Sequence, residues 1–343
     1  MADNTAAHQP NDFGIAVKAE TSLGTPIDDP TQLFTDSVSL PSFAPDQDLS
    51  AKSGKFVADF AEIYSSMKNT PSEITFTGLL NDTAMLFLKG VLHTTPTASN
   101  ATPPYNIVVS DSYTAPNLYH GLTNTTATET YTIKVISPQL TDNQSSPTTS
   151  DGCIELAGCT VTAFSVFTDA GTDGGRVKYS CTLKTGYSPT FLHAPGTVGA
   201  PTTDGMRTIH DFVDRTIAGV DGPVMQSFNL NIENPSDYLG WDPTNNRPYS
   251  ISRSVPEGPV ITLSSTVKLD YDTRALLGNF MNASAQTGLE NTIADNSTWN
   301  SASEFGFTCD KAIITGMSLN EQAAMMYNVD QKLLFGTFRI RYT

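Results

Sequence analysis

The chain has 343 residues, of which 19 are basic and 35 acidic, and its net charge is −16. A surface with this excess of negative charge repels phosphate, so the composition argues against a protein that binds nucleic acid tightly. Only 16% of the residues are charged, and Thr, Ser, Asn and Gly are abundant. This is typical of a β-rich, loop-rich protein, built as one elaborated domain or two ordinary ones.

The first 50 residues are expected to form an N-terminal arm and loop. Residues 1–12 are polar, and Ile15 and Val17 mark a short strand that runs into a Gly-Thr-Pro turn. Residues 27–50 are rich in Asp, Pro and Ser, with a further strand expected at 33–40.

A helix is expected in the following segment. Residues 54–68 fit helical and strand spacing equally, and residues 72–77 look extended. From 81 to 92 an apolar stripe recurs at helical spacing, with Asn81 or Asp82 as the N-cap.

Two segments rich in Thr and Pro, 94–130 and 185–208, are expected to be loop insertions. The first holds a short strand at 105–109. Between the insertions, 131–136 is expected to be a strand and 137–151 a loop.

A hairpin is expected from residues 154–167 and 176–184, joined by an Asp- and Gly-rich turn. In its second strand the apolar residues Val177, Tyr179, Cys181 and Leu183 alternate with the polar residues Lys178, Ser180, Thr182 and Lys184. A period of two indicates a strand with one buried and one wetted face.

A second hairpin is expected from 225–233 and 260–271, across a connection rich in Pro, Asn and Gly. Its apolar residues are Phe228, Leu230, Ile232, Ile261, Leu263, Val267 and Leu269. The polar residues between them include Asn229, Asn231, Glu233, Thr262, Ser264, Thr266, Lys268 and Asp270. We expect the two hairpins to form the two halves of one sandwich or barrel.

The C-terminal part combines one helix with further strands. Residues 273–281 are expected to be helical, 282–303 a polar loop, 305–317 extended, 319–327 a short helix or strand, and 333–342 the last strand. The inward-facing residues of the helix are expected to be Leu276, Leu277 and Phe280.

The four cysteines give no metal-site pattern. Cys153, Cys159, Cys181 and Cys309 show no CxxC spacing and none lies beside a histidine, so neither a metal nor another cofactor is expected. A chain of this size needs no disulfide, and the sequence leaves their pairing open.

No signal peptide is expected, because the N-terminus is polar and acidic. The most apolar run, 84–92, contains Lys89 and is too short to span a bilayer. Synthesis and folding in a cytoplasm are therefore expected.

No catalytic motif is found, and no enzymatic activity is expected. The loop 169–175 can be compared with a calcium loop, but it lacks the alternating ligands and the final Glu, which favours a plain hairpin tip. Trp241 and Trp299 lie in polar segments, where an interface anchor or a local core contact is favoured over stacking on a sugar.

Four segments together resemble the tail tube proteins of tailed bacteriophages. They are 14–26, with its Lys-Ala-Glu-Thr-Ser-Leu-Gly-Thr run; 71–80 with the helix that follows it; the hairpin 158–186; and the hairpin 227–270. Each is short, but their order matches that family and they span most of the chain. The insertions 94–130 and 185–208 depart from the pattern.

The resemblance implies a mainly β fold: a β-sandwich or barrel with a flanking α-helix and long loop insertions, spanning residues 1–343 as one domain. It also implies a structural virion protein made in the cytoplasm of a host bacterium. Six copies would close into a ring, and stacked rings would form a tube for DNA ejection. Partners would be further copies, the tape measure, the tail terminator and the baseplate or tip. DNA would pass without specific binding, and no membrane partner is implied.

In such a tube, the polar face of one hairpin would line the lumen. The candidates are Asn229, Asn231, Glu233, Thr262, Ser264, Thr266, Lys268 and Asp270, with Lys178, Ser180, Thr182 and Lys184 of the other hairpin as a second set. The period alone does not tell which hairpin faces inward. The alternative function is another virion or surface β-protein, such as an adhesin or decoration protein, that binds a host ligand through its loops.

Overall fold

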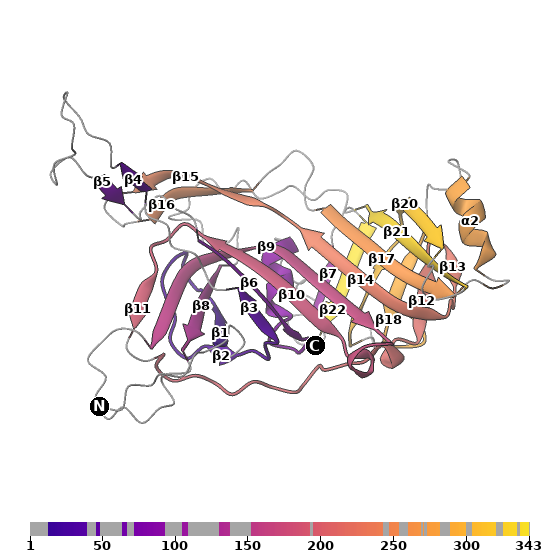
Figure 1. Ribbon diagram of the computed structural model, residues 1–343, viewed down its shortest axis with the longest axis horizontal. Coiled ribbons are helices and arrows are strands. Elements are labelled where there is room, and N and C mark those ends of the chain that lie inside the picture. Colours follow the sequence, from indigo (N-terminus) through magenta and orange to yellow (C-terminus); the bar gives the residue numbers. More distant parts are fainter. Residues whose placement is uncertain are drawn as a thin grey trace.

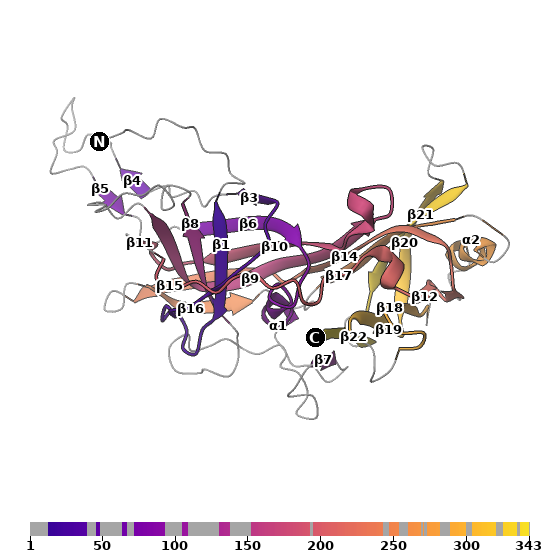
Figure 2. The same cartoon turned by 90° about the horizontal axis from the view of Figure 1, so that it is seen from below.

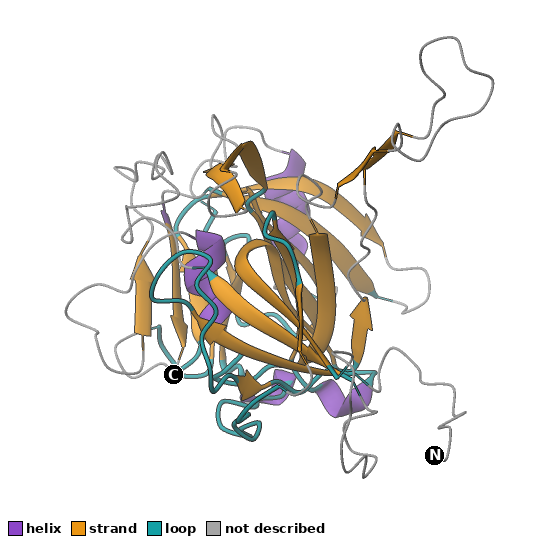
Figure 3. Cartoon of the chain, turned by 90° about the vertical axis from the view of Figure 1, so that its left-hand side faces the viewer, coloured by secondary structure: helices purple, strands orange, loops and turns teal. Residues whose placement is uncertain are grey.

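The computed structural model describes the chain in segments, with gaps between them. These are residues 13–39, 46–48, 64–66, 72–92, 105–108, 130–137, 152–192, 195–242, 247–253, 260–268, 270, 273–281, 289–299, 304–319, 325–334 and 337–342. Strands make up most of the described chain (Figure 3), so the prediction of a mainly β fold is confirmed.

The long strand β9 (Cys153–Asp169) links two groups of strands. Its first half pairs with β8 (Tyr131–Ile136) and β11 (Thr190–Leu192), and its second half pairs with β10 (Lys178–Thr185) and β14 (Met225–Glu233). Gly158 lies in the first half with φ +61°, and a Cβ there would lie 2.4 Å from the Tyr187 ring. Only glycine satisfies both constraints at this position.

Eight antiparallel strands form what we call the large sheet (Figure 1). Their order is β3 (Ser37–Ser39), β6 (Ser72–Leu79), β10, β9, β14, β17 (Val260–Lys268), β21 (Met326–Leu333) and β20 (Ala312–Leu319). The same twelve-stranded assembly continues through the first half of β9 into β11, β8, β1 (Gly14–Ala19) and β2 (Thr31–Gln32).

A second sheet packs against one half of the large sheet (Figure 2). Its order is β13 (Val220–Asp221), β12 (Asp214–Ile217), β18 (Asn291–Ala294), β19 (Gly306–Cys309), β22 (Phe338–Tyr342) and β7 (Tyr105–Val108). The Phe228 ring lies 5.4 Å from the Phe212 ring and 6.3 Å from the Phe307 ring, centroid to centroid. These contacts form the aromatic centre of a β-sandwich.

A reciprocal pair of hydrogen bonds joins the two sheets. Asn291 of β18 donates to the Gln331 side-chain oxygen at 3.0 Å, and Gln331 of β21 donates back at 2.9 Å. The Asn291 oxygen also accepts from the Ala218 backbone N–H. Both side chains are buried, so the pair satisfies amides that would otherwise be costly to bury.

The helix α1 (Leu86–Leu92) covers the other half of the large sheet. Phe87 packs against Phe76, Tyr131 and Phe164. Asn81 caps the turn before the helix, because its side-chain oxygen accepts from the Ala84 N–H at 3.0 Å. The flanking helix was predicted, and of the two predicted caps, Asn81 and Asp82, the structure uses Asn81, although the α-helix begins at Leu86 and residues 82–85 form turns.

The second helix, α2 (Arg274–Met281), lies at the edge of the molecule beside β20 (Figure 1). Leu276 is buried as predicted. Leu277 is 46% exposed, so the prediction that it faces inward is wrong. The short helix presents only one row of residues to the protein.

Two small hairpins complete the described strands. One pairs β4 (Asp46–Asp48) with β5 (Tyr64–Ser66), and the other pairs β15 (Ser236–Asp242) with β16 (Arg247–Arg253). The second occupies the connection that was expected to be loop. Gly240 and Pro248 lie within its strands, and both residues weaken a strand pattern in sequence.

Several other expectations are corrected. The two predicted hairpins do not form opposite halves of a sandwich, because β9 pairs directly with β14 in one sheet. Residues 282–303 contain β18 and residues 185–208 contain β11. The expected last strand is divided between the end of β21 and β22. Most of 54–68, 94–130 and 137–151 lies outside the described residues, apart from β5 and β7.

The N-terminal strand is held by one carboxylate, that of Glu20. Its two oxygens accept from the backbone N–H groups of Gly24 and Gly158, both at 2.8 Å, and from the hydroxyls of Thr130 and Thr132. Burial raises the pKa of this carboxyl, against the opposing effect of these hydrogen bonds. The Glu of the Lys-Ala-Glu-Thr run therefore ties the turn after β1 to β8 and β9.

A buried lysine lies on the same strand pair, β8 and β9. Lys134 Nζ donates to the Pro195 carbonyl at 2.9 Å and lies 3.4 Å from the Glu155 carboxylate. Lys134 and Glu155 are both buried and face each other on β8 and β9. A buried pair of this kind is sensitive to the loss of either partner.

All four cysteines are buried free thiols. Burial raises the pKa of Cys153 to about 11, and it raises the pKa of Cys159 and of Cys181 well above the ordinary value. These thiols are therefore poor nucleophiles near neutral pH.

Candidate functional site

One face of the large sheet is mostly polar, apart from Phe167 of β9 and Ile313 at the β20 edge, and we call it the polar face. A single row of paired residues crosses all eight strands on this face: Ser37, Thr77, Ser180, Ser165, Asn231, Thr262, Lys332 and Ile313. The alternate residues of the same strands point to the core, as the burial of Phe164, Leu230 and Leu263 shows.

Seven of the eight first-choice candidates lie on the polar face. Asn229 pairs with Ser264, Asn231 with Thr262, and Ser227 with Thr266, so β14 and β17 present these side chains together. Glu233 and Lys268 follow at the same alternation and are exposed. The strand period in the sequence identified this set correctly as one face of two neighbouring strands.

The second candidate set lies on the same polar face. On β9, Phe167 pairs with Lys178 of β10 on one side and with Asn229 of β14 on the other. Ser165 of β9 links Ser180 to Asn231 in the same way. Thr182 and Lys184 continue the alternation along β10. The two hairpins therefore do not offer alternative faces, because both contribute to one surface.

Asp270 does not belong to the polar face. β17 ends at Lys268, and the Asp270 carboxylate accepts from the Thr273 N–H at 3.0 Å just before α2. In return the Asp270 N–H donates to the Thr273 hydroxyl at 2.9 Å. Asp270 is a helix-capping residue, and its alternation with β17 in the sequence is coincidental.

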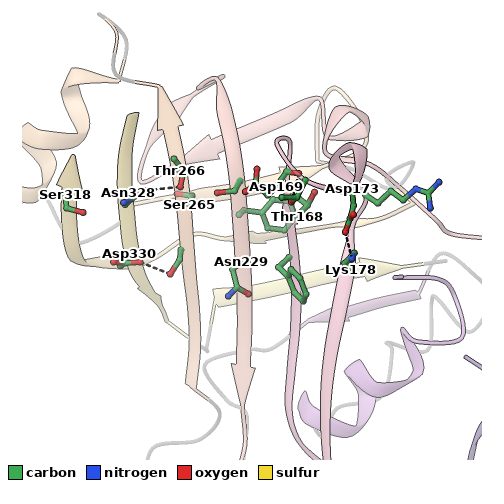
Figure 4. Close-up of a pocket in the computed structure, with 16 residues that line it drawn as sticks. Thr168, Asp169, Asp173, Lys178, Asn229, Ser265, Thr266, Ser318, Asn328 and Asp330 are labelled. Atoms are coloured by element: carbon green, nitrogen blue, oxygen red, sulfur yellow. Dashed lines mark hydrogen bonds and ion pairs between the residues drawn. The ribbon is translucent and has the colours of Figure 1, made fainter. Parts of the chain in front are cut away.

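The polar side chains bond to one another across the strands (Figure 4). Ser264 donates to Asp330 at 2.7 Å, and Thr266 donates to Asn328 at 3.0 Å. Asn328, Asp330 and Lys332 of β21 were not among the candidates. Their strand was missed because the buried Gln331 breaks the apolar alternation that would have revealed it.

The charges on the polar face are balanced. Among the described residues, the strands of the large sheet place four acidic and four basic side chains there: Glu73, Asp169, Glu233, Asp330, Lys178, Lys184, Lys268 and Lys332. These strands therefore do not share the acidic excess of the whole chain, because the net charge of −16 resides in the other residues.

Lys178 is held between two carboxylates. Its Nζ lies 2.9 Å from Asp36 and also contacts Asp173 of the β9–β10 turn. The hydrogen bond to Asp173, followed by that to Asp36, raises the pKa of Lys178, and the same bond lowers the pKa of Asp173. The lysine is thus charged at neutral pH, and its charge is locally compensated.

A concavity of about 530 Å³ lies on the polar face, toward the end of the strands near the β9–β10 turn (Figure 4). Its lining combines hydroxyl and amide groups with two aromatic residues, Phe167 and Phe228. Its lining includes Phe167, Asp169, Asp173, Arg176, Lys178, Ser227, Asn229, Ser264, Thr266, Ser318, Asn328 and Asp330. Such a surface offers hydrogen-bond donors and acceptors, and it carries both positively and negatively charged side chains.

The turn 169–175 is ordered by its own contacts. The Asp169 carboxylate accepts from the Gly171 N–H at 2.7 Å and from Gln226 at 3.0 Å, and Asp173 pairs with Lys178. Within the described residues, no group of His, Cys, Asp or Glu side chains is arranged to hold a metal ion.

The structure describes the surroundings of the Trp299 side chain but not those of Trp241. The Arg341 guanidinium lies over the Trp299 ring, 5.4 Å from its centroid, and the Trp299 N–H donates to Asp214. Trp299 is therefore engaged within the protein. Trp241 belongs to β15, whose side chains lie outside the described part of the structure.

Comparison with known proteins gives no match: no family model fits the sequence, and no curated protein is similar to it. Neither of the described helices has the length and apolar character needed to cross a bilayer.

Proposed function

We propose that this protein is a structural virion protein whose rings stack into a phage tail tube, with the polar face lining the channel through which DNA is ejected. The observation that carries the proposal is the polar face itself. It crosses seven strands and reaches Ile313 on the eighth, and among the described strands neither β3 nor β20 has a partner on its outer side. A polar surface that ends at unpaired strands on both sides is suited to continuation in neighbouring copies.

The edge strand β20 is the first support. Among the described strands it pairs only with β21, so its other side carries unpaired backbone groups. Its sequence, Ala312–Leu319, contains no charge and no proline, and Ile313 and Leu319 are 41% and 59% exposed. Charges and proline, two of the features that protect edge strands in monomeric proteins, are absent from β20, and the helix α2 lies beside it. An edge strand without charges or proline favours pairing with another chain.

The balanced charge of the polar face is the second support. Neutral Ser, Thr and Asn side chains cover its middle, and Lys178 is compensated by carboxylates. Tight binding of DNA needs several uncompensated cations along the phosphates. A hydrated channel wall without such cations lets DNA slide.

The bore of the tube depends on how many strands each copy contributes. Six copies with four strands each would make a barrel of about 24 strands, which at about 4.8 Å per strand and a tilt of about 40° is roughly 48 Å across its backbone. Contribution of the whole large sheet would double this width. The diameter in electron micrographs therefore reports how much of the polar face lines the channel.

The proposal is tested by electron microscopy of the purified protein and of two matched variants. Wild type is expected to form rings or tubes at high concentration. Ile313→Lys places a charge on the open edge and should abolish assembly, whereas Thr262→Lys, in the same row but at mid-sheet, should still assemble. A wild type that stays monomeric in every buffer would contradict the proposal.

A further inference from the structure

The strand β20 is the longest edge strand of the twelve-stranded assembly and the second sheet. It has eight residues, whereas the other edge strands, β2, β3, β7, β11 and β13, have two to four each. Within the described residues, β21 is the only segment that forms backbone hydrogen bonds with β20. The helix α2 beside it satisfies its own backbone groups, so the outer N–H and C=O groups of β20 are left for another chain.

Exposed apolar side chains gather around this edge. Within the described residues nine large apolar side chains are exposed, and five of them belong to α2, to β20 or to the residue that precedes β21: Leu277, Met281, Ile313, Leu319 and Met325. Figure 1 shows α2, β20 and β21 together at one end of the molecule. Such a concentration of apolar side chains is typical of a surface that another protein covers.

The length of β20 selects its partner. Ring closure joins β20 to β3 of the next copy, and β3 has only three residues. Among the edge strands of these sheets, only a second β20 matches β20 in length. Two antiparallel copies of one edge strand pair around a two-fold axis, which is the commonest symmetry of soluble homo-oligomers.

We propose that two free copies of this chain pair through β20 to form a two-fold dimer, in which one large sheet continues into the other. The inference goes beyond the proposed function, because it concerns the unassembled protein and holds whether or not rings form. The dimer occupies an edge that ring closure needs, so it holds subunits back from assembly. By mass action, pairing of two copies prevails over closure of six when the protein is dilute.

The two faces of β20 follow from its pairing with β21. Ile313 and Ser318 lie on the polar face, opposite Lys332 and Asn328. The core-side residues of β20 are Ala312, Ile314, Met317 and Leu319, whose partners on β21 are buried or pack against the core. A contact with another β20 must keep these two sets apart, because residues directly opposite each other share a face of the sheet.

Pairing of all eight residues satisfies this condition in one register. Ile313 then lies opposite Ser318 of the second copy, both on the polar face. On the core side, Ala312 lies opposite Leu319, and Ile314 lies opposite Met317. The bulge between Ile314 and Gly316 falls at the two-fold axis, so both strands bend at the same place and paired residues follow on either side.

Paired cysteine variants test this register. Ile313→Cys and Ser318→Cys each place one thiol on an exposed residue, and the natural cysteines are buried. A dilute mixture of the two variants, treated with a short bis-maleimide, should give a two-chain band on a denaturing gel. Either variant alone should give single chains, because five residues at about 3.3 Å each, roughly 16 Å, separate its two thiols across the axis.

The mass in solution is an independent measurement. Light scattering should give the mass of two chains for dilute wild type and Thr262→Lys, and half that mass for Ile313→Lys, because a lysine on an edge strand disfavours pairing. A mixture that does not cross-link, or single variants that cross-link as well as the mixture, would overturn the proposal. Rings without the mixed cross-link would refute only the dimer, whereas the mixed cross-link without rings or tubes at any concentration would refute only the tail tube function.

Discussion

The polar groups on the open face of the large sheet and those buried beneath it belong to the same residue types but have opposite roles. On the polar face, Ser264 and Asp330 bond to each other at the surface. In the interior, Lys134 with Glu155 and Asn291 with Gln331 bond where water is excluded. The buried groups determine how the strands and sheets fit, whereas loss of the groups on the polar face should cost little stability.

The largest contrast is expected between two lysines. Lys134→Met leaves the buried Glu155 without its cation and should lower the free energy of unfolding by about 3–5 kcal/mol. Lys178→Met on the polar face should cost no more than about 1 kcal/mol. Urea unfolding monitored by circular dichroism measures both. The double variant Lys134→Met/Glu155→Met should recover most of the loss, and a double variant as unstable as Lys134→Met would contradict the buried-pair account.

The next largest loss in the free energy of unfolding is expected at the contact between the two sheets. Asn291→Leu leaves the Gln331 amide and the Ala218 N–H without their partner and should cost about 2–3 kcal/mol. Adding Gln331→Leu should restore part of this, since both side chains of the pair are then apolar. If the two substitutions instead add up, the reciprocal amide pair does not join the sheets energetically.

Glu20→Gln tests the hydrogen bonds that hold the N-terminal strand, through the pH dependence of the free energy of unfolding. The amide cannot accept from all four donors, so the variant should be less stable by about 1–2 kcal/mol. Because burial raises the pKa of Glu20, the folded protein holds this proton more tightly than the unfolded chain. Wild-type stability should therefore fall as the pH rises from the usual value near 4.5 through the raised pKa.

The variant lacks this titration, so its stability should change less over the same pH interval. Unfolding midpoints measured in urea at several pH values report the difference. Equal pH slopes for wild type and Glu20→Gln would show that this carboxyl is not perturbed in the folded protein.

The smallest effect is expected on the polar face. Ser264→Ala and Thr266→Ala each remove a surface hydrogen bond, and each should change the free energy of unfolding by less than about 0.5 kcal/mol. Thermal unfolding of the two variants beside wild type is the measurement. A loss comparable to that of Asn291→Leu would remove the distinction between the polar face and the interior.

Local pattern in the sequence predicted the strands of both hairpins and the side on which their polar residues lie. The alternation over 177–184 and 228–233 is clear, and the structure places β10 (Lys178–Thr185) and β14 (Met225–Glu233) there with the expected buried sides. The cap at residue 81 or 82 was also predicted, because Asn or Asp followed by an apolar stripe is a local signal, and the structure uses Asn81.

Long-range pairing was not evident from local pattern. A period of two shows that a strand has one buried face, but it does not say which strand lies beside it, so the β9–β14 pairing could not be predicted. β21 was missed because a buried polar residue, Gln331, replaces an apolar one, and Asp270 was misassigned because a helix cap happened to continue the strand alternation.

The central claim, that the polar face lines a closed channel, can be tested by labelling one position. The natural cysteines are buried, so Lys332→Cys provides a reactive thiol on the polar face for a heavy-metal maleimide. Electron microscopy of assembled particles should then show the label inside the bore of the tube. Label on the outer surface, or the absence of any tube from labelled and unlabelled protein, would contradict the account.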